Sequence, residues 1–145
     1  MTHQQYATAD WRVSLPADWR HLRTSPDGVA YFESADGHYG LYIAVWDVGD
    51  AQRAANDVVD EFVQAECRNL DAMPEHAWAH APHATGPGEA LVDSLEQARH
   101  YRVICRLIAQ PPLVLRASFH DYDCRDTAQS NRVLGPLLES VALTG

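Results

Sequence analysis

Three residues of the run SFHD, Ser118, His120 and Asp121, could in principle work together in hydrolysis. A hydroxyl nucleophile, an imidazole base and an orienting carboxylate are the parts of a catalytic triad. On a strand, Ser118 and His120 share a face about 6.5–7 Å apart, whereas a nucleophile and its base need roughly 2.6–3.2 Å. Asp121 falls on the opposite face, and the chain has no GxSxG motif. We therefore predict no catalytic residue here.

A second candidate is the histidine cluster of EHAWAHAPH, which contains His76, His80 and His83. Zinc needs three or four ligands converging at about 2 Å. Spacings of four and three converge on a helix, but Pro74 and Pro82 disfavour a helix in this segment. On a strand, His76 and His80 share a face and His83 points away. We predict a histidine-bearing surface loop rather than a metal site.

The three cysteines, Cys67, Cys105 and Cys124, are widely spaced and contain no CxxC pair. This pattern is typical of reduced thiols in a cytoplasmic protein. Three aspartates near Cys124 should raise the pKa of its thiol. We predict that Cys105, within an apolar run, is a small core residue. The chain has no phosphate-binding glycine motif, HExxH or EF-hand loop, so no cofactor is expected.

A polar group remains, Arg116, His120 and Tyr122, which alternate along one predicted strand. With Trp78 from an earlier segment, they are our predicted partner-binding residues. They could line a cleft where a helix leaves the sheet uncovered. The alternative is that Arg116 lies at a sheet margin and pairs with a helix carboxylate, which is the more common arrangement.

These side chains are positioned by residues 99–124, two β-rich runs separated by Pro111-Pro112, which we predict to form the central hairpin. Because both prolines have fixed φ angles, we expect a four-residue loop, Gln110 to Leu113, with Arg102 beside Asp121. One face then carries Ile104, Ile108, Leu115 and Phe119. The other carries Val103, Cys105, Leu107, Val114, Arg116, Ser118, His120 and Tyr122.

Around this hairpin the pattern predicts a strand at 11–15, a hairpin of 29–34 with 39–47, and a strand at 90–97. The first hairpin should place Tyr31 opposite Tyr42. A helix over 51–70 should begin at Asp50, and a second over 127–142 at Asp126. Pro136 should kink the second helix or divide it at Gly135. We predict that residues 73–88 are irregular, apart from a short strand at 77–81.

The chain has 145 residues and a formal net charge of -9, which fit one domain, 1–145, and disfavour nucleic acid and anionic membranes. No apolar run is long enough for membrane insertion, and the N-terminus lacks the features of a signal peptide. All basic residues are arginines, a hint of a GC-rich bacterial genome. We expect a cytoplasmic location.

The order of elements, with VSLPADW, GLYIAVW and LVLRASFHDYD, resembles the PsbP/Mog1-like superfamily. The resemblance implies an α+β fold, an antiparallel β-sheet flanked by helices in an α/β/α sandwich. Members are mostly non-enzymatic binding proteins: photosystem accessory subunits, a nuclear-transport GTPase partner and bacterial chaperones of secreted effectors. No binding residue of the superfamily can be matched to this chain.

We therefore expect a non-enzymatic bacterial protein-binding module, an adaptor, effector chaperone or immunity-type protein. Its partner is expected to be a protein, and a second copy of the chain is one candidate. The alternative is a small-molecule-binding protein or an unrecognised enzyme that uses a cleft near Arg116, His120 and Tyr122.

Overall fold

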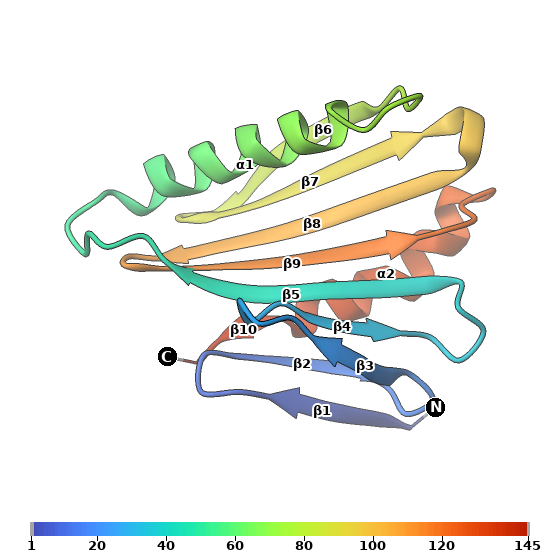
Figure 1. Ribbon diagram of the computed structural model, residues 1–145, viewed down its shortest axis with the longest axis horizontal. Coiled ribbons are helices and arrows are strands. Elements are labelled where there is room, and N and C mark those ends of the chain that lie inside the picture. The colour runs from blue at the N-terminus through green and yellow to red at the C-terminus, as the bar shows by residue number, and fades with distance from the viewer. Residues whose placement is uncertain (1, 145) are drawn as a thin grey trace.

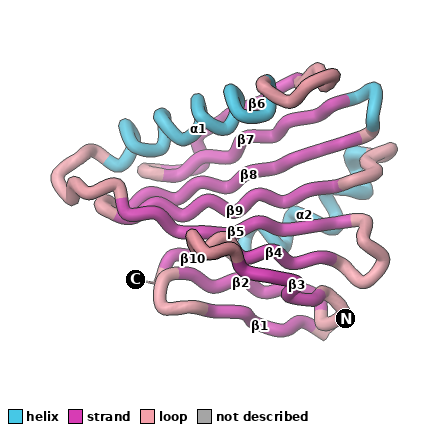
Figure 2. The backbone as a smooth tube through the Cα atoms, viewed as in Figure 1, coloured by secondary structure: helices cyan, strands magenta, loops and turns pink. Residues whose placement is uncertain are grey.

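A computed structural model describes residues 2–144 and shows a large antiparallel sheet, a small sheet and two helices (Figures 1 and 2). In spatial order, the seven strands of the large sheet are β3 (Arg20–Thr24), β4 (Ala30–Glu33), β5 (Tyr39–Asp47), β9 (Leu113–Asp121), β8 (Tyr101–Gln110), β7 (Glu89–Glu96) and β6 (Ala79–Gly86). The small sheet contains β1 (His3–Ala7), β2 (Trp11–Pro16) and β10 (Ala142–Leu143). The helices are α1 (Ala55–Asp71) and α2 (Thr127–Ser140). The predicted α+β class is confirmed.

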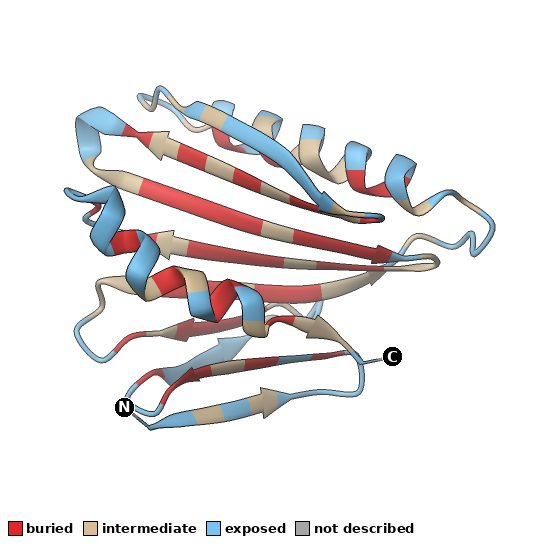
Figure 3. Ribbon diagram, turned by 180° about the vertical axis from the view of Figure 1, so that it is seen from behind, coloured by how far each residue is buried: buried red, intermediate tan, exposed pale blue. Residues whose placement is uncertain are grey.

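The two helices lie on opposite faces of the large sheet (Figures 1 and 3). Helix α1 packs on β7 and β8, where its buried Val58 and Val59 meet Ala109 and Val114. Helix α2 and the small sheet cover the other face, around the fully buried Phe119. Strands β8 and β9 are therefore buried on both faces for most of their length, which explains their nearly continuous apolar sequence.

The predicted register of the central hairpin is confirmed, because Arg102 pairs with Asp121 and Ala109 pairs with Val114. The predicted four-residue loop is wrong, since Gln110 and Leu113 also pair and leave a turn of two prolines. The Pro111-Pro112 peptide bond is cis, the geometry of a type VI turn. The two prolines can therefore form a two-residue hairpin turn of this type. They cannot form the primed hairpin turns, because those need positive φ angles.

Helix α1 starts at Ala55, later than predicted. Asp50 accepts a hydrogen bond from the Gln52 N–H in the preceding loop and does not cap the helix. Asp126 does cap α2, accepting from the N–H groups of Ala128 and Gln129. Helix α2 runs through Pro136 without the predicted division into two segments.

The segment 73–88, predicted to be irregular apart from a short strand at 77–81, contains the whole of β6. The strand begins at Ala79 and continues to Gly86, farther than predicted, and it pairs along its length with β7. Trp78 lies just before this strand. Strand β6 forms one outer edge of the large sheet and contains Pro82, and β3 forms the other edge and has a bulge between His21 and Arg23. A short 3-10 turn, Gln97–Arg99, joins β7 to β8.

Candidate functional site

On the α1 side of the sheet, aromatic side chains form a continuous band across several strands. We call this band the aromatic belt. Its members are His76, Trp78, Tyr101, His120, Tyr122, Tyr42 and Tyr31. Helix α1 packs mainly on β7 and β8 and also reaches β9 and β5 at Val114, Arg116 and Trp46. The belt residues of β9, β5 and β4 lie farther along the sheet than these contacts (Figure 1).

Neighbouring rings of the belt are in contact along its whole length. Ring centroids are 5.1 Å apart between Trp78 and Tyr101, and 5.7 Å apart between Tyr101 and His120. The band continues through Tyr42, 5.2 Å from His120, to Tyr31, 4.4 Å from Tyr42. These separations lie in or near the range in which aromatic pairs add stabilisation beyond their buried area.

Hydrogen bonds fix the tyrosines at one end of the belt. The Tyr31 hydroxyl donates to Glu33 at 2.6 Å and lies 3.0 Å from the Tyr122 hydroxyl. The Arg23 guanidinium lies 4.5 Å from the centre of the Tyr31 ring, a cation–π arrangement. A Cβ atom at Gly40 would lie 2.7 Å from the Tyr122 hydroxyl oxygen, so glycine at this position makes room for the tyrosine pair.

Burial keeps the polar groups of the belt uncharged. It raises the pKa of Tyr31 and Tyr101 above the ordinary value for tyrosine. Burial, with a smaller contribution from the Arg116 charge, lowers the pKa of His120 to about 3. At neutral pH the hydroxyls of Tyr31 and Tyr101 and the imidazole of His120 are therefore uncharged.

His120 hydrogen-bonds on both sides of its ring, to the Tyr101 hydroxyl through Nδ1 at 2.6 Å and to Ser118 Oγ through Nε2 at 3.1 Å. The inference that Ser118 and His120 lie too far apart for a hydrogen bond is wrong, because the imidazole reaches across the spacing between the two positions on the strand. Ser118 is fully buried. Asp121 lies on the opposite face, as predicted, with its carboxylate 2.8 Å from His38 Nε2. The buried Ser118 hydroxyl thus finds its hydrogen-bond partner in His120, which belongs to the belt.

Arg116 lies outside the belt. Its Nε and Nη2 donate to Glu66 Oε1 of α1 at 3.0 and 2.6 Å, which is the helix-carboxylate alternative considered from the sequence. With Trp46 and Phe62, these residues line a cavity of about 280 Å³. The structure thus brings together three of the four predicted partner-binding residues, Trp78, His120 and Tyr122, and separates Arg116 from them.

Sequence reasoning missed His76, Tyr31, Tyr42 and Tyr101 as belt members. A signal was available, because the first hairpin predicted Tyr31 opposite Tyr42, and that pairing is confirmed. The unpredicted step was the pairing of β5 with β9, which sets Tyr42 opposite Ser118 and so next to His120.

The three histidines predicted not to form a metal site are held separately. His80 lies between Asp71 Oδ1 at 2.8 Å and Ser94 Oγ at 2.7 Å, and His76 Nδ1 lies 2.9 Å from the Pro74 carbonyl oxygen. No group of three or more potential metal-ligating side chains occurs among residues 2–144. The three cysteines are free, and burial, followed by the Asp121 charge, raises the pKa of Cys124.

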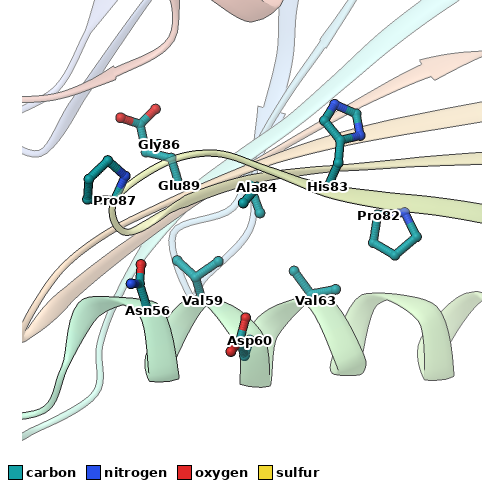
Figure 4. Close-up of a pocket in the computed structure, with 11 residues that line it drawn as sticks. Asn56, Val59, Asp60, Val63, Pro82, His83, Ala84, Gly86, Pro87 and Glu89 are labelled. Carbon is teal, nitrogen blue, oxygen red and sulfur yellow. The ribbon is translucent and has the colours of Figure 1, made fainter.

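A groove of about 610 Å³ separates α1 from β6 and the β6–β7 turn (Figure 4). Pro82 and Ala84 point from the strand toward the helix, and Val59 and Val63 point back at them, whereas His83 points away. The small side chains of β6 leave this space open. The groove is a second concave surface on the same side as the belt.

The architecture is a PsbP/Mog1-like fold. It is similar to the solution structure of cyanobacterial PsbP (CyanoP) from Synechocystis sp., with a TM-score of 0.69, 11% identity, and coverage of 97% of this chain and 92% of that one. It is also similar to a mutant of the protein Mog1, with a TM-score of 0.63, 12% identity, and coverage of 99% and 97%. No protein-family model and no curated protein sequence matches the chain.

The resemblance drawn from the sequence is thus confirmed at the level of fold. Within residues 2–144, neither helix combines the length and apolar character needed to cross a bilayer.

Proposed function

We propose that the protein is a non-enzymatic binding module of the bacterial cytoplasm that holds another protein against the aromatic belt. The observation that carries this proposal is a continuous band of aromatic rings, most of them partly exposed, beyond the contacts of α1 with β9 and β5 on the same face of the sheet. Tyr122 is 36% exposed, and it is one of two large hydrophobic residues in the exposed class among those described.

The composition of the belt is that of interface residues that dominate binding energy. Tyrosine, tryptophan and arginine are enriched among such residues, and the belt contains the first two with Arg23 at its end. Hydrogen bonds already hold Tyr31 and Tyr122 in place, so little side-chain freedom remains to be lost when a partner binds.

The charge distribution indicates what kind of partner fits. The belt is neutral at its centre, and the chain as a whole carries a net charge of -9. A partner with an apolar contact surface surrounded by basic residues would be steered to this protein. A second copy has the same net charge and is repelled, so a different protein is the favoured partner. Adaptor, effector-chaperone and immunity roles all share this binding mode.

Photo-cross-linking in the native host tests the proposal. The cross-linker p-benzoylphenylalanine is introduced in place of Tyr122 and, in a control, in place of the exposed Glu139 of α2. We expect one major cross-linked protein from position 122 and none from position 139. The purified partner should then bind Tyr122→Ser at least about tenfold more weakly than the unsubstituted chain, the loss typical of one important interface residue. Equal cross-linking at both positions, or none at 122, would contradict the proposal.

One observation favours the alternative of an enzyme at this place, the 3.1 Å contact between Ser118 Oγ and His120 Nε2. Complete burial of Ser118 works against it, since a nucleophile must reach its substrate. A hydrolase-substrate screen separates the two functions. Turnover that disappears in Ser118→Ala would replace the binding proposal with a catalytic one.

A further inference from the structure

On the opposite face of the molecule, a cavity of about 450 Å³ lies between α2, the end of β2 and the β4–β5 turn. Its floor is apolar and largely buried, with Trp19 and Leu137 3% and 2% exposed. The Trp19 and Tyr39 rings are nearly parallel, 11° apart, with centroids separated by 6.4 Å. Val133 and Pro136 of α2 complete the apolar wall. Both the volume and this lining are typical of small-molecule sites.

The polar groups around the cavity favour a positive charge. Asp18 and Asp36 contribute two carboxylates, against one guanidinium from Arg132, and His3 and Ser34 also line the cavity. Asp36 Oδ1 accepts hydrogen bonds from the His38 N–H at 3.0 Å and the Ser34 hydroxyl at 2.8 Å. These bonds lower the pKa of Asp36 and keep its carboxylate charged. The net charge of -9 on the whole chain acts in the same direction. An ammonium group has three N–H donors, which the carboxylates of Asp18 and Asp36 can accept.

From the apolar floor and the acidic rim, we propose that this cavity binds a small organic amine, an ammonium group attached to an aromatic or branched apolar body. The apolar body lies against Trp19 and Tyr39, and the ammonium group faces Asp18 and Asp36. The site lies on the α2 side of the sheet and is independent of the aromatic belt.

Three probes that share one body and differ in charge test this proposal by isothermal titration calorimetry: 2-(1-naphthyl)ethylammonium, 2-(1-naphthyl)ethanol and 1-naphthylacetate. We expect the cation to bind tightest and the anion weakest, with about fivefold between successive members, the effect of one partly solvated charge contact. Equal affinities, a preference for the anion, or no binding of the cation at millimolar concentration would overturn the proposal.

Two variants locate the site. Asp36→Asn keeps the acceptor for His38 and Ser34 but removes the charge, so it should remove most of the cation's advantage over the alcohol. Val133→Trp fills the cavity and should abolish binding of all three probes, whereas Val63→Trp, in the groove beside α1, should leave binding unchanged. Circular dichroism establishes that each variant is folded. Binding retained by a folded Val133→Trp, or a cation preference retained by Asp36→Asn, would also overturn the proposal.

Discussion

The ion pair between Glu66 and Arg116 allows a quantitative test of how α1 is fixed to the sheet. The Glu66 side chain is 2% exposed, and both hydrogen bonds to its Oε1 come from Arg116. Its Oε2 has no partner within residues 2–144. Replacing Arg116 with methionine would therefore leave a buried carboxylate with neither its counter-charge nor its two donors.

Breaking a buried ion pair from one side typically costs about 3–5 kcal/mol. Arg116 is 30% exposed and borders a cavity, so water can partly solvate the orphaned carboxylate, and we expect the lower end of that range. For a domain of this size, about 3 kcal/mol corresponds to a fall in Tm of roughly 10 °C. Urea unfolding followed by circular dichroism measures the loss directly.

The double variant Glu66→Met with Arg116→Met separates two free-energy contributions. One is the destabilisation caused by a buried, unpaired carboxylate, and the other is the net stabilisation that the ion pair provides. Replacing both members with apolar side chains is often close to neutral. We expect the double variant to recover most of the stability that Arg116→Met loses. A double variant as unstable as the single one, or a single variant that loses less than about 1 kcal/mol, would refute the reasoning.

Three further measurements test other parts of the structure. In the folded chain the pKa of His120 is about 3, whereas in the unfolded chain it is near 6.5. Because the unfolded state then binds a proton that the folded state does not, the free energy of unfolding falls as the pH is lowered below about 6.5. Between about pH 7.5 and pH 5, the unsubstituted chain should lose roughly 1–2 kcal/mol more than His120→Gln in parallel urea titrations, and equal losses would contradict the buried, neutral state. Asp126→Ala removes the cap of α2 and should lower the free energy of unfolding by about 1 kcal/mol in the same assay. Gly40→Ala should displace Tyr122 and lower stability by about 1–3 kcal/mol, whereas Gly135→Ala, where an added Cβ meets nothing within 4 Å, should raise it by roughly 0.5–1 kcal/mol. The opposite order in thermal melts would show that the Gly40 contact is absent.

The hairpins were predictable because their pairing follows from local pattern. The turn assumed in each hairpin set Arg102 opposite Asp121 and Tyr31 opposite Tyr42 without knowledge of the rest of the chain, and both pairings are confirmed. Only the start of β6 was predicted, as a short strand at 77–81, because Pro82 and its small neighbours lack the β-branched signal of a buried strand. In the sheet, β6 is paired with β7 alone. The start of α1 was misplaced because its N-cap, Ala54, uses no side chain.

The candidate site was harder to predict because it joins segments far apart in the chain. Trp78, Tyr101 and Tyr31 become members of one belt only because β6, β8 and β4 belong to the same sheet. The short distance between Ser118 and His120 depends on side-chain direction, which a strand repeat does not report. The pairing of Arg116 with Glu66 was foreseeable as a type of contact but not as a particular partner.

The two outer strands of the large sheet restrict how this protein can assemble with others. Pro82 on β6 offers no N–H to a strand that might join that edge, and the bulge between His21 and Arg23 disturbs the hydrogen-bond spacing along β3. Both ends of the sheet are thereby protected against extension by an incoming chain. On the proposed function, recognition would then depend on side chains presented by a face, and partner choice could change by substitution of a few rings while the backbone scaffold stays the same.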